Sequence, residues 1–233
     1  MDVGDTILMM NKGSPDYLIE GDVMIPRKRT AMKCHSESFS CLWPMSNNGK
    51  VEVPFLISDQ YASDEVASIL KALTDFHSVT CIRFIPRETQ QMYIQFESRV
   101  GCFSAVGRIG ERQVISLQRN GCVKHGVIQH EVMHSLGFYH EHARSDRDDH
   151  IQIHWENIIL GEISNFQKMD TNNLGKPYDY QSVMHYGRTA FSTNMGDTMT
   201  PIPDASIPIG QRVGMSKIDI EMINKLYKCS STP

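Results

Sequence analysis

The chain has 233 residues, of which 40% are hydrophobic and 21% are charged. This length and composition are typical of a folded globular protein that buries its core as one large domain or two small lobes. A formal net charge of -4 with mixed signs leaves no extended basic face, which argues against nucleic acid or an anionic membrane surface as the partner.

The first 29 residues differ from the rest of the chain. They show no sustained hydrophobic period, carry Gly-Ser-Pro at 13–15 and end in the basic run PRKR at 26–29. They also lack the basic and apolar regions of a secretory signal. This stretch is therefore predicted to be a tail or a pro-segment.

A sheet is predicted next, because strand-like segments rich in β-branched or aromatic residues are each bounded by turn formers. These segments are VEVPFLI (51–57), TCIRFIP (80–86), MYIQFES (92–98), CFSAVG (102–107) and RQVISLQ (112–118). They predict about five strands. Between the first two, SDEVASILKALTDF (63–76) has apolar residues at helical spacing, which predicts a helix packed on the sheet.

A second helix is predicted over 124–136, ending at Gly137. Residues 138–215 are polar, punctuated by Gly and Pro and weakly periodic, so disulfides, a metal or a function must hold this long irregular stretch together. Helical spacing resumes in SKIDIEMINKLYK (216–228). No stretch approaches the roughly 18 consecutive apolar residues of a membrane-spanning helix.

The stretch HEVMHSLGFYHEH (130–142) carries four histidines and two glutamates. His130 and His134 are four residues apart on a predicted helix, so their rings lie on one face within reach of a single zinc ion. Glu131 lies beside that face, where it can act as general base on a water held by the metal. Gly137 allows a turn that brings His140 to the same ion, leaving one open position and a reactive water. The alternative is a set of surface histidines, but the extended spacing argues against it.

Six cysteines, even in number and without a C-x-x-C pair, favour three disulfides and an oxidising compartment. Buried free thiols in a cytosolic protein are the alternative. With disulfides, the absence of a signal indicates that one has been trimmed from the chain.

HEVMHSLGFYHEHARSDRD (130–148) resembles the zinc signature of the astacin family of metalloendopeptidases, within the metzincins, and SVMHY (182–186) looks like its Met-turn. The resemblance runs from about residue 19 to the C-terminus. It implies an α+β, two-lobed fold, with a twisted mixed sheet and two long helices in the N-terminal lobe and a mostly irregular C-terminal lobe with a terminal helix. It also implies one Zn²⁺ per chain, Met184 as a hydrophobic floor beneath the ligands, and Tyr186 as a weak additional ligand and oxyanion stabiliser.

IEGDVMIP (19–26) looks like the family's pro-segment motif, in which the aspartate matching Asp22 occupies the metal position where water should lie. Without that resemblance, Gly21-Asp22 would be an ordinary turn and PRKR a solvated charge run. With it, cleavage after Arg29 exposes Thr30. The expected organisation is a pro-segment (1–29) and a catalytic domain (30–233), divided into lobes at about 30–137 and 138–233.

The family's two usual disulfides correspond to Cys81–Cys229 and Cys102–Cys122, and the extra pair is Cys34–Cys41. The extra pair, with TAMKC (30–34) and PYDYQSVMHYGR (177–188), resembles the six-cysteine fish hatching enzymes, or choriolysins. Related six-cysteine astacins that serve other tissues are the alternative.

Charged residues beyond the zinc ligands are expected to form a structural network rather than to contact substrate. They are Arg144, Asp146, Arg147 and Asp148. In relatives with a shorter N-terminus, the residue matching Glu141 pairs with the new α-amino group. Here the Cys34–Cys41 loop adds residues ahead of that point, so the salt bridge is not carried over to Glu141. Glu141 is instead expected to orient neighbouring backbone or side chains. An extended substrate is expected to pair with the edge strand within 102–107.

The sequence therefore predicts a latent, secreted zinc endopeptidase, stored in secretory granules before release. Its substrate is expected to be an extracellular egg-envelope protein, and a second protease is expected to cut near Arg29–Thr30. Glu131 takes a proton from the zinc-bound water and passes it to the leaving amine. A non-catalytic zinc-stabilised binding module, or a zinc hydrolase acting on esters or sugars, is the alternative.

Overall fold

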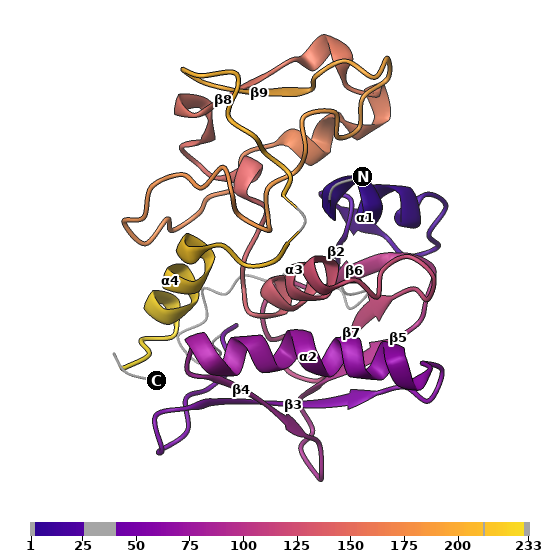
Figure 1. Cartoon of the computed structure of the whole chain (residues 1–233), viewed down its shortest axis with the longest axis vertical. Coiled ribbons are helices and arrows are strands. Elements are labelled where there is room, and N and C mark those ends of the chain that lie inside the picture. The colour runs from indigo at the N-terminus through magenta and orange to yellow at the C-terminus, as the bar shows by residue number, and fades with distance from the viewer. Residues whose placement is uncertain (1–2, 26–40, 212, 231–233) are drawn as a thin grey trace.

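The computed structural model describes residues 3–25, 41–211 and 213–230 (Figure 1). The helices are α1 (Val3–Asn11), α2 (Ser63–Val79), α3 (His125–Ser135) and α4 (Lys217–Leu226). The strands of the main sheet are β1 (Leu18–Ile19), β2 (Val23–Met24), β3 (Val51–Ile57), β4 (Ile82–Pro86), β5 (Tyr93–Glu97), β6 (Cys102–Ser104) and β7 (Arg112–Leu117). A small second sheet contains β8 (Ile151–Ile153) and β9 (Met199–Pro201).

The main sheet is mixed, with the strand order β1-β2-β6-β7-β5-β3-β4. Strands β4, β3, β5 and β7 pair in parallel, and β6 runs antiparallel to β7. The five strands predicted between residues 51 and 118 are confirmed. Strands β1 and β2 come from the N-terminal segment, and β2 lies along the outer edge of β6 with Val23 opposite Ser104. The edge expected to receive substrate is therefore covered by residues 18–24.

Helices α2 and α3 pack on the sheet, and α3 lies between it and the C-terminal region (Figure 1). Helix α2 buries Ile69, Leu73 and Phe76 at helical spacing, as predicted. Each such side chain contributes about 1.5–3 kcal/mol when fully buried. Helix α3 is different, because every residue from Gly126 to Ser135 is buried. It is the central helix of the molecule, and its polar side chains therefore need internal partners.

The region after α3 has its own apolar cluster, which includes Ile151, Phe166, Tyr178, Tyr186 and Met199. Its chain is mostly irregular, as expected, but β8 pairs with β9 and the described part of this region contains four short 3-10 helices. These are η1 (Glu141–Ala143), η2 (Arg147–Asp149), η3 (Trp155–Asn157) and η4 (Leu160–Phe166). The predicted terminal helix is α4, and its Ile223 is buried in the same core as the main sheet.

The disulfides Cys81–Cys229 and Cys102–Cys122 tie these parts together. Both pairs agree with those that the family resemblance implies. The first joins the start of β4 to the residues after α4, and the second joins β6 to the loop before α3. The predicted pair Cys34–Cys41 stays a prediction, because Cys34 lies outside the described residues.

The N-terminal segment, predicted from its sequence to be a tail or pro-segment without a sustained hydrophobic period, contains a helix that was not predicted. Residues 3–11 form α1, which packs beside β6 and α3 (Figure 1). Thr6 and Ile7 are buried against the rest of the protein. The helix is stabilised by that tertiary packing and not by a strong local period. Among the described residues, no helix has the length and apolar character needed to cross a membrane.

Candidate metal centre and active site

Helix α3 places three of the predicted site residues in the interior. His130 and His134 are one turn apart with ring centroids separated by 4.8 Å, and Glu131 lies between them on the next face. All three side chains are buried. The spacing of the sequence motif therefore becomes a pair of imidazoles directed to one point, as predicted.

Gly137 ends the helix and redirects the chain. Its φ of +106° lies in the region that favours glycine, and its N–H donates to the His134 carbonyl at 2.8 Å. The turn brings His140 back, so that its ring centroid lies 5.2 Å from that of His130 and 4.7 Å from that of His134. The three predicted ligands therefore converge.

Asp22, on the N-terminal segment, completes the cluster. One carboxylate oxygen lies 3.0 Å from His130 Nε2, and the other lies 3.3 Å from His134 Nε2 and 3.2 Å from His140 Nε2. Ligand atoms of the four residues all lie within 4.8 Å of one another, and all four side chains are buried. Burial favours the neutral acid, but the charges of His140 and His134 outweigh it and hold the pKa of Asp22 well below its usual range.

The outer nitrogens of the rings fix the ring orientation. His130 Nδ1 donates to the Val183 carbonyl and His134 Nδ1 donates to the Phe138 carbonyl, each at 2.8 Å. His140 Nδ1 instead contacts a Glu20 carboxylate oxygen at 2.7 Å. With Nδ1 used as donor, each Nε2 lone pair is directed into the centre of the cluster.

The residues present fit a zinc ion. Within the described part of the chain, Asp22 Oδ1 and His134 Nε2 are buried and have no hydrogen-bond partner. Unsatisfied buried ligand atoms are costly in a folded protein unless something binds them. Three imidazoles and a carboxylate at one point are the donor set that zinc accepts, and a bound cation would replace any proton on the inward-facing ring nitrogens.

Glu131 lies beside this centre. Both of its carboxylate oxygens are buried and, among the residues that the structure describes, neither accepts a hydrogen bond. Burial, and then the nearby charge of Asp22, raise the pKa of Glu131 well above its usual range. A buried carboxyl with a raised pKa, adjacent to a metal position, is suited to take up and release a proton.

Met184 and Tyr186 lie on the segment that contacts His130 through the Val183 carbonyl and His140 through the Tyr186 ring. Met184 is buried in the same core as α3. Tyr186 is fully buried, its ring centroid lies 4.4 Å from that of His140, and its hydroxyl donates to the Glu20 carbonyl. The N-terminal segment thus contacts the Tyr186 hydroxyl through Glu20 as well as the histidine cluster through Asp22.

Asp219, on α4, anchors this segment and was missed by the sequence analysis as a site-supporting residue. Its carboxylate accepts from Ser182 Oγ at 2.6 Å and from the Val183 N–H at 3.0 Å, and it also closes the capping box of α4 with Ser216. The Val183 carbonyl in turn accepts from the His130 ring. The terminal helix therefore helps to set the orientation of one predicted ligand.

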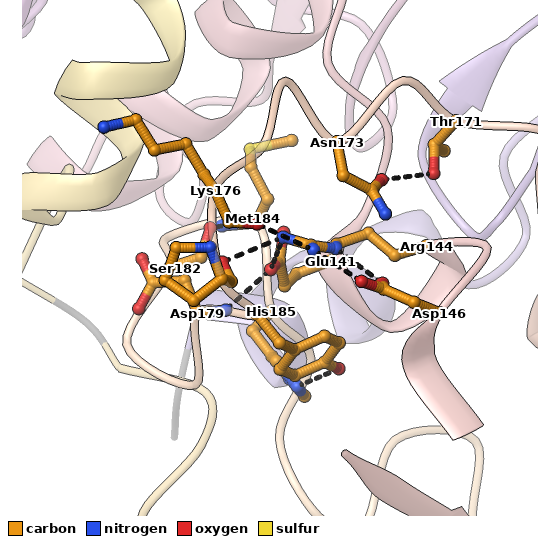
Figure 2. A network of polar contacts seen from close by, with 12 residues as sticks. Glu141, Arg144, Asp146, Thr171, Asn173, Lys176, Asp179, Ser182, Met184 and His185 are labelled. Atoms are coloured by element: carbon orange, nitrogen blue, oxygen red, sulfur yellow. Dashed lines mark hydrogen bonds and ion pairs between the residues drawn. The ribbon is translucent and has the colours of Figure 1, made fainter. Parts of the chain in front are cut away.

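The charged residues beyond His140 form the structural network that was predicted (Figure 2). Arg144 donates from Nη1 to Glu141 at 3.0 Å and from Nε and Nη2 to the two oxygens of Asp146, each at 2.9 Å. Glu141 also accepts from the Asp179 N–H at 2.7 Å, which ties η1 to the chain leading into the Met-turn. A second pair joins Arg147 Nε to Asp148 at 2.5 Å.

Other functional contacts had no signal in the sequence. Val183 and Phe138 act through backbone carbonyls, which any residue supplies, and Glu20 was passed over although it is two residues from Asp22. Only the folded chain shows that Glu20 reaches His140. The remaining predicted site residue, Cys34, lies outside the described residues, as do the residues around the expected cleavage point.

Comparison with known proteins agrees with this geometry. The family model described as Astacin, a peptidase family, matches residues 42–228. The low choriolytic enzyme of Oryzias latipes is 54% identical over 228 residues, which cover 98% of this chain and 84% of that protein. The high choriolytic enzyme 1 of the same fish is 50% identical over 230 residues, covering 98% of this chain and 84% of that protein.

Solved structures give the same result for the fold. The structure of high choriolytic enzyme 1, a hatching enzyme zinc-protease from Oryzias latipes, matches with a TM-score of 0.82 and 51% identity, covering 86% of this chain and 100% of that chain. Myroilysin matches with a TM-score of 0.53 at 18% identity over 80% of this chain and 95% of its own. The second likeness shows the fold alone.

Proposed function

The chain belongs to the astacin family of peptidases and is a zinc-dependent metalloendopeptidase; on that premise we propose that His130, His134 and His140 hold the zinc and that Asp22 keeps the enzyme latent. One observation carries the proposal. Three histidine nitrogens and the Asp22 carboxylate converge within 4.8 Å in the interior, beside Glu131, which has no hydrogen-bond partner within the described ranges. A site with three ligands from the catalytic part of the chain leaves one position for chemistry once Asp22 has left.

Zinc, when bound, polarises the scissile carbonyl and lowers the pKa of a water molecule to about 7. Glu131 takes the proton of that water as the new carbon–oxygen bond forms. The hydroxyl of Tyr186 then donates to the developing oxyanion, and Met184 supports the histidines from below. When the carbon–nitrogen bond breaks, Glu131 returns the proton to the departing amine.

Latency is proposed to depend on residues 1–29 as a pro-segment. Asp22 occupies the catalytic position, Tyr186 is held by the Glu20 carbonyl, and β2 covers the edge of β6. Cleavage after Arg29 by a protease that recognises basic residues would release all three contacts. The catalytic domain would then be residues 30–233, with lobes of about 30–137 and 138–233.

Limited trypsin treatment tests this proposal. The chain is assayed on an unstructured protein substrate before and after cutting, the new N-terminus is sequenced and zinc is quantified. We expect activity to appear with Thr30 exposed and one zinc retained. The Glu131→Gln chain, cut in parallel, is the matched control and should keep zinc without turnover. Full activity in the uncut chain would contradict the role of Asp22, and zinc without activity in either form would contradict the peptidase assignment.

The proposed substrate is an extracellular egg-envelope protein, and the proposed role is in hatching. The support is the 54% and 50% identity to choriolytic enzymes, together with two disulfides, which form in oxidising compartments. We also propose that the enzyme acts outside the cell, after storage in secretory granules. Another six-cysteine astacin with a different protein substrate is the alternative. Incubation of the cut enzyme with isolated fish egg envelopes and with casein separates them: release of envelope peptides supports hatching, and cleavage of casein alone contradicts it.

A further inference from the structure

The C-terminal end of α1 makes contacts with β6 that the metal position does not require. Asn11, the last residue of the helix, donates from Nδ2 to the Cys102 carbonyl at 2.6 Å, and its Oδ1 accepts from the Cys102 N–H at 2.6 Å. Its Nδ2 also reaches the Gly21 carbonyl at 2.8 Å. One side-chain amide therefore bonds both polar groups of a strand residue and also holds the residue before Asp22.

These two bonds have the pattern of strand pairing. In an antiparallel pair, directly opposed residues exchange both N–H···O bonds. The Asn side chain carries one carbonyl and one NH₂ in a plane, so it can supply both bonds in place of a strand residue. On β6, Cys102 and Ser104 direct their N–H groups away from β7, and Ser104 donates to the Asp22 carbonyl at 3.1 Å. Asn11 and Asp22 together satisfy both outward-facing N–H groups of this strand.

The surroundings are shaped for this contact. Ile7 is fully buried in the main core and Met10 packs against it. At Gly101, which has a φ of +98°, an added Cβ would overlap the Asn11 side chain. The helix is thus docked by apolar contacts that set the Asn11 amide in register with Cys102.

We propose that Asn11 is a second inhibitory contact, separate from Asp22, in which its amide takes the place of a substrate backbone on Cys102. The inference rests on the proposed function, because it assigns the outer edge of β6 to an extended substrate. Latency then has two separable parts: the Asp22 carboxylate withholds the metal position, and Asn11 withholds the Cys102 end of the β6 edge, next to the Ser104 end that β2 covers. Loss of Asp22 alone frees the first and leaves the second in place.

The test uses full-length, uncut chains in the Asp22→Ala background, alone and with Asn11→Ala, Asn11→Asp or Lys12→Ala. Lys12 is the exposed neighbour of Asn11 and serves as the matched control. Kinetics on a short unstructured peptide give KM and kcat, and mass spectrometry checks that the chains stay uncut. All variants become the same enzyme after cleavage, because the substitutions lie within residues 1–29, so the cut samples calibrate folding and concentration.

We expect the uncut Asp22→Ala chain to have a higher KM than its cut form. Adding Asn11→Ala should lower that KM about tenfold, as loss of the two side-chain hydrogen bonds to the Cys102 backbone predicts. Asn11→Asp, which places an acceptor opposite the Cys102 carbonyl, should act in the same direction, and Lys12→Ala should change nothing. Amide hydrogen exchange at Cys102 should speed up with Asn11→Ala in the otherwise unaltered chain.

Two results would overturn the proposal: an uncut Asp22→Ala chain with the KM of the cut enzyme, or an Asn11→Ala substitution that changes neither KM nor Cys102 exchange. Failure of the proposed function is distinguishable from both. It would leave the cut samples inactive, whereas the exchange measurement would still report whether Asn11 protects Cys102.

Discussion

Replacing Arg144 should lower the unfolding free energy much more than replacing an arginine of an exposed ion pair, because Arg144 belongs to a buried charge network. Its side chain is 5% exposed and that of its partner Glu141 is 12% exposed. It also bonds Asp146 and the carbonyls of Lys176 and Pro177 (Figure 2). Arg144→Met keeps an unbranched apolar stem, is shorter by the guanidinium group, and removes every one of these bonds.

The expected loss follows from burial. Removing one partner of a buried ion pair leaves an uncompensated charge and costs about 3–5 kcal/mol in unfolding free energy. The matched control is Arg112→Met, which breaks the pair with Glu97 at a side chain that is 43% exposed. Exposed pairs of this kind contribute about 0–1 kcal/mol. The double variant Arg144→Met/Glu141→Gln should recover part of the loss, because its buried partner is no longer an acid and still accepts from the Asp179 N–H.

Urea unfolding of the four chains with their disulfides intact gives these differences. Equal losses of unfolding free energy in Arg144→Met and Arg112→Met would contradict the role of burial. A double variant no more stable than Arg144→Met alone would show that the cost does not arise from an unpaired Glu141.

Three further changes have defined outcomes. Glu131→Gln should lower kcat of the cut enzyme about 100- to 10,000-fold, with an unchanged zinc content by elemental analysis; near-normal turnover would remove its assignment as the base. Tyr186→Phe should lower kcat about 100- to 1000-fold with zinc retained, and an unchanged kcat would show that the phenol does not stabilise the oxyanion. His77 accepts from the Phe84 N–H at 2.8 Å, and burial, then Arg83, lower its pKa. Because the folded state binds this proton less readily than the unfolded state, His77 contributes stability that is present above about pH 6.5 and is lost as the pH falls. The unfolding free energy of the natural chain should therefore exceed that of His77→Leu by less at about pH 5.5 than at about pH 7.5, and an equal difference at both values would contradict this.

The sequence predicted the elements whose hydrophobic or ligand residues recur at a regular spacing within one segment. Helix α2 could be predicted because the apolar residues of its buried face recur at helical spacing. It was predicted over 63–76 and extends over Ser63–Val79. The ligands on α3 follow from helix geometry, and His140 follows from the turn at Gly137. In these cases the determining interactions lie within one helix and the turn after it.

Non-local contacts could not be predicted in the same way. Strand β8 pairs with β9 across a long intervening stretch of chain, and each strand is very short. Helix α1 depends on burial of Ile7 against the main core, which has no local signature. Carbonyl partners such as Val183 and Phe138 are invisible for another reason, because the backbone group is the same in every residue.

We propose that Asp22 occupies the fourth position of a three-histidine metal site and leaves it on activation. The visible spectrum of the cobalt-substituted chain, recorded before and after cleavage, tests it most directly, because the absorption of Co²⁺ depends on the identity and geometry of its ligands. We predict that cleavage changes the spectrum and that the uncut Asp22→Ala chain already has the spectrum of the cleaved form. Identical spectra before and after cleavage, unaffected by Asp22→Ala, would contradict the claim.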